Sequence, residues 1–352
     1  MTPLGNLLAR RIAATGPIPL SDYMAECLLH PKHGYYSTRD PLGQAGDFIT
    51  APEVSQMFGE VIGLALAQAW MDQGAPAAFV LAELGPGRGT LMADALRATA
   101  GVPGFHAAAQ VILIEASAPL RAQQAERLPQ ARHIDGLDAL PAAPLFLVAN
   151  EFFDALPIRQ FQRDPGGWRE VMVGLEGEAL RPGLSDPAPL AALDHRLEDT
   201  APGDIVETCP ALPGIVAQIG TRLARHGGAA LILDYGDWRA LGDTFQALEE
   251  HAQADPFAAP GRADLTAHVD FEALALAAAP ACHTRLTAQG VFLERLGITD
   301  RARALARGLH GAALDSHVAA HRRLTHPDEM GHLFKVMGLF PEGHPAPPGL
   351  ET

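Results

Sequence analysis

The sequence predicts an α/β protein whose core is a parallel sheet with helices on both faces. From residue 77 onwards, short apolar runs alternate with helix-forming segments, which is the pattern of repeated strand–turn–helix units. A glycine-rich turn joins the first apolar run to the helix that follows it. Apolar residues make up 48% of the chain and charged residues 19%, a balance that fits a folded globular protein.

Residues 1–75, before the first strand, are expected to form an N-terminal helical extension. This extension is also expected to contain a loop that closes over a substrate- and cofactor-binding site. Its predicted helices are Leu4–Thr15, Asp22–Leu29 and Val54–Gln73. Gly16-Pro17 ends the first helix, and Ser21 is a suitable N-cap for the second. The segment His30–Asp47 is rich in Pro, Gly, Tyr and His and is expected to be an ordered loop.

The core is expected over residues 76–290, with an insertion at about 159–202. Its strands are predicted at Phe79–Glu83, Gln110–Glu115, Ala131–Ile134, Pro144–Ala149 and Ala229–Asp234, followed by Thr244–Glu249 and His283–Ala288. Helices are predicted at Leu91–Thr99, Pro119–Leu128 and Leu212–His226. Asp164-Pro165-Gly166-Gly167 is a hairpin signal, and with the Pro-rich stretch after it this signal marks the insertion.

A C-terminal helical cap and tail are expected over residues 291–352. The predicted helices of this region begin near Val291, Asp300 and Leu314, after an earlier one that begins at Phe271. The tail, Pro341–Thr352, is rich in Pro and Gly.

Composition and charge narrow the possible partners. The formal net charge of −15 repels phosphate backbones, so nucleic acid is not an expected ligand, whereas a cationic partner fits. The three cysteines are far apart and predict free thiols in a reducing compartment. No apolar run approaches the ~18 residues that a membrane span requires, and no secretory signal opens the chain. Met1–Leu20 could pass for a short transit peptide, but an ordinary first helix is preferred because the helical pattern continues through Ser21–Leu29, so a cytoplasmic location is expected. The 15 histidines are scattered without a metal-binding motif, so no metal is expected, and the oligomeric state stays open.

The strongest local signal is the turn after the first strand, Glu83-Leu84-Gly85-Pro86-Gly87-Arg88-Gly89. Glycines there let the backbone turn sharply and approach a ligand, and such ligands bind at the carboxyl ends of the strands. The spacing G-x-G-x-G, with Glu83 two residues before Gly85, differs from the dinucleotide fingerprint G-x-G-x-x-G. It resembles the first motif of methyltransferases that use S-adenosylmethionine (SAM), whose cationic amino-acid end favours a nearby carboxylate. We therefore expect Glu83, Gly85, Gly87 and Gly89 to bind SAM, and an NAD-type cofactor stays the alternative.

Two further acidic residues follow strands at suitable places. Glu115 ends the second strand, 30 residues after Gly85, where a carboxylate accepts hydrogen bonds from the two ribose hydroxyls of a nucleoside. Asp135 follows the third strand, and its turn is expected to lie against the adenine.

The fourth strand leads into a loop whose side chains suit a cationic substrate: Asn150, Glu151, Phe152, Phe153 and Asp154. A guanidinium is planar and stays protonated, so carboxylates such as Glu151 and Asp154 can grip it in a fork and aim one nitrogen at a methyl donor. We expect Asn150, Glu151 and Asp154 to be catalytic and the two phenylalanines to contact substrate. The alternatives are that Asp154 caps a turn and that Phe152 and Phe153 belong to the core.

Two other segments are expected to contribute from a distance. Asp47 and Thr50 are expected to close over the cofactor and the substrate entrance, although Thr50 and Glu53 also fit a capping box at a helix start. His268, in Asp264–Phe271, is expected to bind substrate, and a packed histidine is the alternative.

Several of these stretches together resemble the MidA-like family of SAM-dependent methyltransferases. The resemblance runs from about Gly16 to Met337. Its most specific parts are Gly-Asp-Phe-Ile-Thr-Ala-Pro-Glu, beginning at Gly46, and Asn-Glu-Phe-Phe-Asp-Ala-Leu-Pro, beginning at Asn150. Other stretches that carry it are His30–Tyr36, Glu83–Leu91, Ile114–Ser117, Leu233–Gly236, Asp264–Phe271 and Gln289–Leu293.

The resemblance implies a class I, Rossmann-like methyltransferase core, the N-terminal extension, an inserted or C-terminal cap, and SAM as methyl donor. For the mitochondrial members it implies dimethylation of an arginine in a subunit of respiratory complex I during assembly. The expected function is therefore protein arginine methylation, with a complex I (NADH–quinone oxidoreductase) subunit as the substrate hypothesis. A small-molecule methyltransferase and a SAM-binding assembly chaperone with little turnover stay as alternatives.

Overall fold

A computed structural model describes residues 1–38, 50–249 and 252–352 of the chain. The chain forms two compact units, each built from three separate segments. Unit 1 comprises Met1–Phe48, Asp154–Leu212 and Arg239–Asp270, and unit 2 comprises Ile49–Phe153, Pro213–Trp238 and Phe271–Thr352. Both units are discontinuous along the chain, and they do not test whether separate domains begin and end near residues 75 and 290. Those domain boundaries stay predictions.

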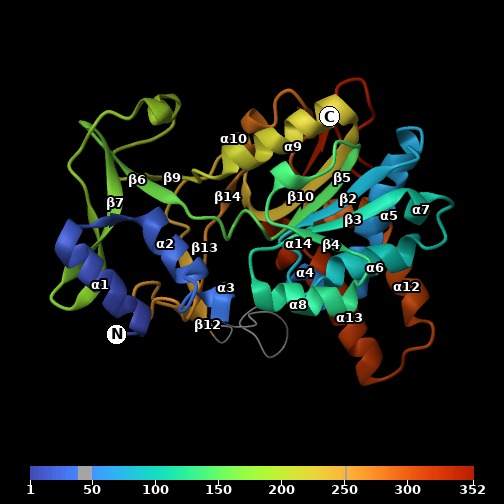
Figure 1. The fold of residues 1–352 in the computed structure, drawn as a ribbon, viewed down its shortest axis with the longest axis horizontal. Coiled ribbons are helices and arrows are strands. Elements are labelled where there is room, and N and C mark those ends of the chain that lie inside the picture. The colour runs from blue at the N-terminus through green and yellow to red at the C-terminus, as the bar shows by residue number, and fades with distance from the viewer. Residues whose placement is uncertain (39–49, 250–251) are drawn as a thin grey trace. The chain divides into compact units, whose positions relative to one another are not determined.

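Unit 2 contains a central sheet with the strand order β15-β17-β10-β5-β2-β3-β4 (Figure 1). The strands are β2 (Phe79–Leu84), β3 (Ala109–Ile114), β4 (Arg132–Ile134), β5 (Leu145–Asn150), β10 (Gly228–Asp237), β15 (Cys282–His283), β16 (Thr287–Ala288) and β17 (Phe334–Phe340). The five strands from β10 to β4 are parallel, whereas β17 runs antiparallel to β10, β15 and β16. After β2 the chain builds β3 and β4 on one side and then returns to add β5 on the other. The strand order therefore reverses between β2 and β5, which is where open α/β sheets bind ligands, at the carboxyl ends.

Helices cover both faces of this sheet, and for this reason β2 and β5 are buried along their whole length. The helices are α4 (Ala51–Val54), α5 (Gln56–Asp72), α6 (Thr90–Thr99), α7 (Phe105–Ala108), α8 (Ala118–Arg127), α9 (Leu212–His226), α10 (Phe271–Ala277), α11 (Gln289–Arg295), α12 (Ile298–Ala306), α13 (Ala312–Thr325) and α14 (Met330–Leu333). Figure 1 shows α9 and α10 on one side of the sheet, with α5 and α6 on the other. A short 3-10 helix, Leu137–Ala139, follows β4.

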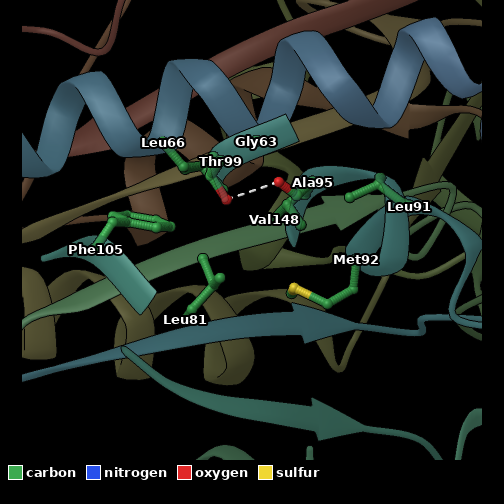
Figure 2. Close-up of a pocket in the computed structure, with 9 residues that line it drawn as sticks. All are labelled: Gly63, Leu66, Leu81, Leu91, Met92, Ala95, Thr99, Phe105 and Val148. Carbon is green, nitrogen blue, oxygen red and sulfur yellow. Dashed lines mark hydrogen bonds between the residues drawn. The ribbon is translucent and has the colours of Figure 1, made fainter. Parts of the chain in front are cut away.

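The helices α5 and α6 pack unusually closely because two glycines of α5 face α6. A Cβ atom on Gly59 would lie 2.7 Å from Asp94 Cβ, and one on Gly63 would lie 2.5 Å from Ala95 Cα. Figure 2 shows Gly63 beside side chains from α6, α7, β2 and β5, in a space too small to admit a water molecule. This tight layer fixes the start of α6, and with it the loop that connects α6 to β2.

Unit 1 combines the N-terminal helices with two small antiparallel sheets. Its helices are α1 (Pro3–Thr15), α2 (Leu20–Leu29), α3 (Tyr35–Thr38) and the 3-10 helix Ala191–Arg196. Its strands are β1 (Ile18–Pro19), β6 (Arg159–Asp164), β7 (Gly167–Glu176), β8 (Ala179–Leu184), β9 (Ile205–Thr208), β11 (Gln246–Glu249), β12 (Ala252–Ala254), β13 (Asp264–Thr266) and β14 (Val269–Asp270). One sheet has the order β1-β7-β6-β9, with β8 beside β7, and the other has the order β12-β11-β13. The predicted hairpin is present as β6 and β7.

Most predicted helices and strands lie within a few residues of the observed ones, and several details differ. The predicted strand His283–Ala288 is two short strands, β15 and β16, and the predicted loop His30–Asp47 contains the short helix α3. Ser21 is not an N-cap, since α2 begins at Leu20 after Pro19. The long helix predicted from Val54 is divided at Ser55, whose extended backbone and side-chain bond to the Met57 amide start α5 anew. The strand β17 was not predicted.

Two absences hold for the part of the chain that the structure describes. None of its helices combines the length and apolar character needed to span a membrane. No group of three or more His, Cys, Asp or Glu side chains there could hold a metal ion.

Candidate active site

The loop between β2 and α6, residues 85–89, is called the glycine loop below. Gly85, Gly87 and Gly89 have φ angles of 60°, 53° and 74°, in the left-handed region that side chains disfavour. A Cβ atom on Gly85 would also lie 2.9 Å from Cδ2 of Phe152. The three glycines are therefore required by the backbone of this loop, and at these three positions no side chain covers the backbone beyond the carboxyl end of β2.

A buried side chain on α8, Gln124, supports the glycine loop from below and was not predicted. Its Nε2 atom donates to the carbonyl oxygen of Gly87 over 2.6 Å and, more weakly, to Oε2 of Glu115 over 3.4 Å. Its Oε1 atom lies 2.9 Å from Nε2 of His133. A sequence signal for it existed, because Leu120, Gln124 and Leu128 are spaced by four residues and share the buried face of α8.

Glu115 lies directly after β3, at the same end of the sheet as the glycine loop. Its Oε1 atom accepts from the Ser117 amide over 2.8 Å, and burial raises the pKa of its carboxyl above the ordinary value. Arg121 of α8 donates to the Glu115 carbonyl oxygen over 2.6 Å. These contacts fix the backbone and carboxylate of Glu115 beside Gln124, and its ribose-binding role stays a prediction.

Asp135 follows β4 and is exposed at the molecular surface. Its Oδ1 atom forms an ion pair of 2.7 Å with Arg121, the residue that also contacts Glu115. Glu115 and Asp135 thus share one arginine, and the adenine role of Asp135 stays a prediction.

Glu83 is buried inside unit 2, with 3% of its surface exposed. Burial raises the pKa of its carboxyl to about 8. A hydrogen bond from the Met92 amide of α6 lowers the pKa, but by less than burial raises it. Its Oε2 atom has no hydrogen-bond partner among the described residues. A buried carboxyl group with an unused oxygen beside the glycine loop is chemically suited to respond to a cationic ligand.

The loop that leaves β5, residues 150–153, is called the β5 exit. Glu151 has a φ angle of 50°, which is uncommon outside glycine and is typical of strained positions at functional sites. Its Oε1 atom accepts from the Asn150 side-chain amide over 3.0 Å and from the Ala51 backbone amide over 2.9 Å. Asn150 thus orients Glu151 directly, and the Asn150 Oδ1 atom has no partner among the described residues.

The two phenylalanines of the β5 exit differ in their surroundings. Phe153 is buried, with 2% of its surface exposed, and its amide donates to Oδ2 of Asp234 over 3.0 Å. Phe152 is only half-buried, and its ring lies against Gly85 of the glycine loop. The rings of Phe152 and Phe153 meet edge to face at 5.1 Å. Phe153 therefore anchors the loop, and Phe152 joins the β5 exit to the glycine loop.

Thr50 is the N-cap of α4, but its side chain makes no capping hydrogen bond. Glu53 instead accepts a hydrogen bond from the Thr90 hydroxyl, at the start of α6. The capping box, which was the alternative interpretation of Thr50 and Glu53, is therefore not formed, and the carboxylate of Glu53 is used in a contact between two helices. Asp47 lies outside the described residues.

Asp154 and His268 belong to unit 1. Asp154 is buried, and its carbonyl oxygen accepts from the Ala267 amide over 3.0 Å. The His268 amide donates to the Thr244 hydroxyl over 2.8 Å. In the same unit, the Tyr36 hydroxyl lies 2.9 Å from both carboxylate oxygens of the buried Asp264. Sequence patterns had singled out the segment of Asp264 but not this contact with Tyr36.

Within unit 2 the structure therefore brings together the glycine loop, Glu83, Glu115 and the β5 exit. These groups offer bare backbone, carboxyl groups and a half-buried aromatic ring at the point where the strand order reverses. Such an arrangement fits SAM, whose amino-acid end carries an ammonium group and whose ribose carries two hydroxyls.

Comparisons with known proteins agree with this geometry. A family model described as "Putative S-adenosyl-L-methionine-dependent methyltransferase" matches residues 61–290. The chain is 36% identical over 372 residues to "Protein arginine methyltransferase NDUFAF7, mitochondrial" of Homo sapiens, with 97% of this chain and 84% of that protein covered. It is 35% identical over 379 residues to the Drosophila melanogaster homolog, with 96% and 85% covered.

Solved structures also resemble this chain over nearly its whole length. A COG1565 superfamily member from Burkholderia thailandensis, bound to S-adenosyl-homocysteine, matches with a TM-score of 0.85 and 31% identity. That comparison covers 98% of this chain and 93% of the other. A native structure of a COG1565 superfamily protein from the same organism matches with a TM-score of 0.83 and 30% identity.

These matches confirm the expected methyltransferase fold, the enzymatic character and SAM as the cofactor. The expected cytoplasmic location is wrong, because the relatives are named mitochondrial. Free cysteines and an acidic surface are properties of many reducing compartments, so they could not distinguish the cytoplasm from a mitochondrion.

Proposed function

The chain belongs to the family of S-adenosyl-L-methionine-dependent methyltransferases, and from that premise we propose that it methylates an arginine side chain of another protein. The relatives named protein arginine methyltransferase, at about 35% identity over nearly the whole chain, support this acceptor. The net charge of −15 supports it too, because a protein segment that carries a guanidinium is cationic.

The observation that carries the proposal is the position of Glu151. Its carboxylate is held at the β5 exit by Asn150 and by the Ala51 amide, on a backbone with a φ angle of 50°. Phe152 follows it directly and lies against the glycine loop through Gly85. An acidic group is therefore fixed on the short segment that contacts the glycine loop.

Each residue of the β5 exit has a role in this proposal. When bound, SAM would supply a methyl group on a sulfonium: the electron pair of the acceptor nitrogen would form the new N–C bond, and the C–S electrons would stay on sulfur, which leaves as S-adenosylhomocysteine. Glu151 accepts guanidinium N–H bonds, orients the nitrogen and stabilises the positive charge. The methylated nitrogen then loses one proton, for which a carboxylate is the acceptor. Asn150 positions Glu151, and Phe152 offers a flat surface to the planar guanidinium.

Asp154 is proposed as a second acidic residue for the acceptor, and His268 and Phe153 as residues that shape its surroundings. For the cofactor we propose that the glycine loop and Glu83 receive the amino-acid end of SAM and that Glu115 receives the ribose. Asp135 is proposed to lie near the adenine, and Asp47 and Thr50 to cover the site.

We further propose that the acceptor protein is a subunit of respiratory complex I. This follows the family resemblance of the two specific sequence stretches that begin at Gly46 and Asn150. Mass spectrometry of complex I subunits from cells with and without the gene tests it: one methylated arginine peptide should disappear on deletion. An unchanged set of methylarginines would exclude this acceptor while leaving other protein acceptors possible.

To test the proposed activity, the purified protein is incubated with radiolabelled SAM and with extract from cells that lack the gene. After acid hydrolysis of the labelled protein, the label should be recovered as methylated arginine. The Glu151→Gln variant should lose at least about a hundredfold in rate, in line with the loss of a group that stabilises developing charge, while still binding S-adenosylhomocysteine. Label on lysine, or only on small molecules, would exclude arginine methylation of proteins.

A matched control is Glu126→Gln, because Glu126 is an exposed carboxylate on α8 of the same unit. This variant should keep the wild-type rate. If Glu151→Gln also kept it, Glu151 would have no catalytic role even though the enzyme methylates arginine.

A further inference from the structure

Thr90 is the first residue of α6 and follows the glycine loop directly. Its hydroxyl group contacts side chains from two other helices. It donates to Oε1 of Glu53 on α4 over 2.5 Å, and it accepts from Nη1 of Arg127 at the end of α8. One hydroxyl therefore links α4, α6 and α8 at the point where the glycine loop ends.

The helix α4 is only four residues long, so it has no stability of its own and its position depends on tertiary contacts. Glu53 attaches it to Thr90, beside the glycine loop. The Ala51 amide attaches it to Glu151, at the β5 exit. The two ends of α4 are thus fixed to the two loops that border the cofactor site in unit 2.

The charges of Arg127 and Glu53 strengthen the two hydrogen bonds of the Thr90 hydroxyl. Arg127 is a cation that donates to the Thr90 oxygen, and Glu53 is an anion that accepts the Thr90 proton. A hydroxyl between a donor cation and an acceptor anion is polarised in the same sense by both, and charge-assisted hydrogen bonds are stronger than neutral ones. Gln124, one turn before Arg127 on α8, adds a separate contact to the same loop through Gly87.

We propose that Thr90 and Glu53 are positioning residues for SAM, because the Arg127–Thr90–Glu53 chain of hydrogen bonds holds the glycine loop and α4 in the arrangement that binds the cofactor. The inference goes beyond the proposed function, since it concerns the cofactor site and holds for any methyl acceptor. Thr50, just before α4, is expected from the sequence to help cover the site. In this proposal α4 is also attached to the glycine loop and to the β5 exit.

The experiment compares Thr90→Val and Thr90→Ser by calorimetric titration of the full chain with S-adenosylhomocysteine. Valine keeps the shape of threonine and removes the hydroxyl, whereas serine keeps the hydroxyl. We expect Thr90→Val to weaken binding about tenfold, as the loss of one charge-assisted hydrogen bond does, and Thr90→Ser to stay within about threefold of wild type. Glu53→Ala should reproduce the loss, and the double variant Thr90→Val with Glu53→Ala should be no weaker than either single one.

Hydrogen exchange supplies a second measurement on the same proteins. S-adenosylhomocysteine should slow the exchange of the α4 amides in the wild type and do so much less in Thr90→Val. Rate measurements should show a raised KM for SAM with a smaller change in kcat.

The matched control is Thr99→Val, because Thr99 ends the same helix and its hydroxyl contacts the Ala95 carbonyl oxygen and His106, neither of which belongs to the glycine loop or α4. We expect this variant to melt at a lower temperature and to bind S-adenosylhomocysteine as the wild type does. Wild-type affinity in Thr90→Val, or an equal loss in Thr99→Val, would overturn the proposal. A wild-type protein that binds S-adenosylhomocysteine but methylates no arginine would instead contradict only the proposed function.

Discussion

The side-chain amide of Gln124 donates a hydrogen bond of 2.6 Å to the carbonyl oxygen of Gly87, the middle glycine of the loop between β2 and α6. Gln124 is completely buried, so its amide would be costly to leave without a partner. The same side chain contacts Glu115 and His133. Gln124 therefore couples the glycine loop to the strand ends at β3 and β4, on which the ribose and adenine sites are expected.

Replacing Gln124 by leucine keeps the volume of the side chain and removes its three polar contacts. The Gly87 carbonyl then loses its partner, and the loop is less well fixed for SAM. We expect the Kd for S-adenosylhomocysteine to rise about tenfold, as measured by calorimetric titration. The exposed Gln130→Leu serves as control and should leave the Kd unchanged. A Gln124→Leu protein that is folded by circular dichroism and binds as tightly as wild type would contradict this role.

The raised pKa of Glu83 predicts an effect of pH on stability. Its carboxyl titrates near 8 in the folded chain and near 4.5 when exposed, so between these values the folded state holds a proton that the unfolded state has lost. The free energy of unfolding should therefore fall as pH rises from 5 to 8, by up to about 1.4 kcal/mol per pH unit from this group. Glu83→Gln should remove that part of the slope in urea titrations without ligand. Equal slopes in the two proteins would mean that Glu83 is ionised in the folded state.

The sequence predicted the sheet and the glycine loop well because both are signalled locally. β2 is a continuous apolar run that leads directly into the glycines, and a parallel buried strand needs no other signal. β17 was missed because its partner β10 lies about a hundred residues earlier in the chain. Its apolar run is also interrupted by Lys335 and Gly338, two residue types that are uncommon in strands, and this weakens the local signal.

The side-chain contacts of one helix with distant parts of the chain could not be predicted from the sequence either. Thr50 and Glu53 have capping-box spacing, but in the fold Glu53 meets Thr90, which is 37 residues away, and this partner cannot be inferred from a local pattern. Gln124 is similar: its spacing from Leu120 marks it as buried, yet nothing in α8 indicates that its partner is Gly87. The residues expected to contact the cofactor could thus be proposed from local patterns, whereas the residues that hold the glycine loop in place could not.

Glu60 on α5 provides a prediction about the helical layer. It has 2% of its surface exposed and accepts hydrogen bonds from Arg301 of α12, over 2.6 and 2.9 Å, and from Arg97 of α6. Burial raises the pKa of Glu60, but the bonds from Arg301 and Arg97 outweigh it and hold the pKa below the ordinary value. Glu60→Gln should therefore lower the free energy of unfolding at pH 7 by about 2 kcal/mol, a typical value for hydrogen bonds to a charged group.

A carboxyl with a lowered pKa in the folded state contributes stability above its unfolded pKa, and this contribution is lost as pH falls through the folded pKa. The difference between wild type and Glu60→Gln should accordingly be constant from pH 6 to 8 and shrink below about 4.5. Denaturant titrations at several pH values measure it. A difference that did not depend on pH would show that packing and not charge is responsible.

The close contact of α5 with α6 predicts a steric effect at Gly63. A methyl group there would lie 2.5 Å from Ala95 Cα and 2.6 Å from Ala95 Cβ, so backbone atoms and not a flexible side chain must move. We expect Gly63→Ala to lower the free energy of unfolding by about 1–3 kcal/mol, the usual cost of overpacking, despite the better helix propensity of alanine. The matched control is Gly214→Ala in the exposed first turn of α9, where no atom lies within 4 Å of the added Cβ. It should be neutral or stabilising by up to about 1 kcal/mol. Because the glycine loop leads directly into α6, the Gly63 variant should also bind S-adenosylhomocysteine more weakly, and normal stability in this variant would mean that α5 and α6 separate without cost.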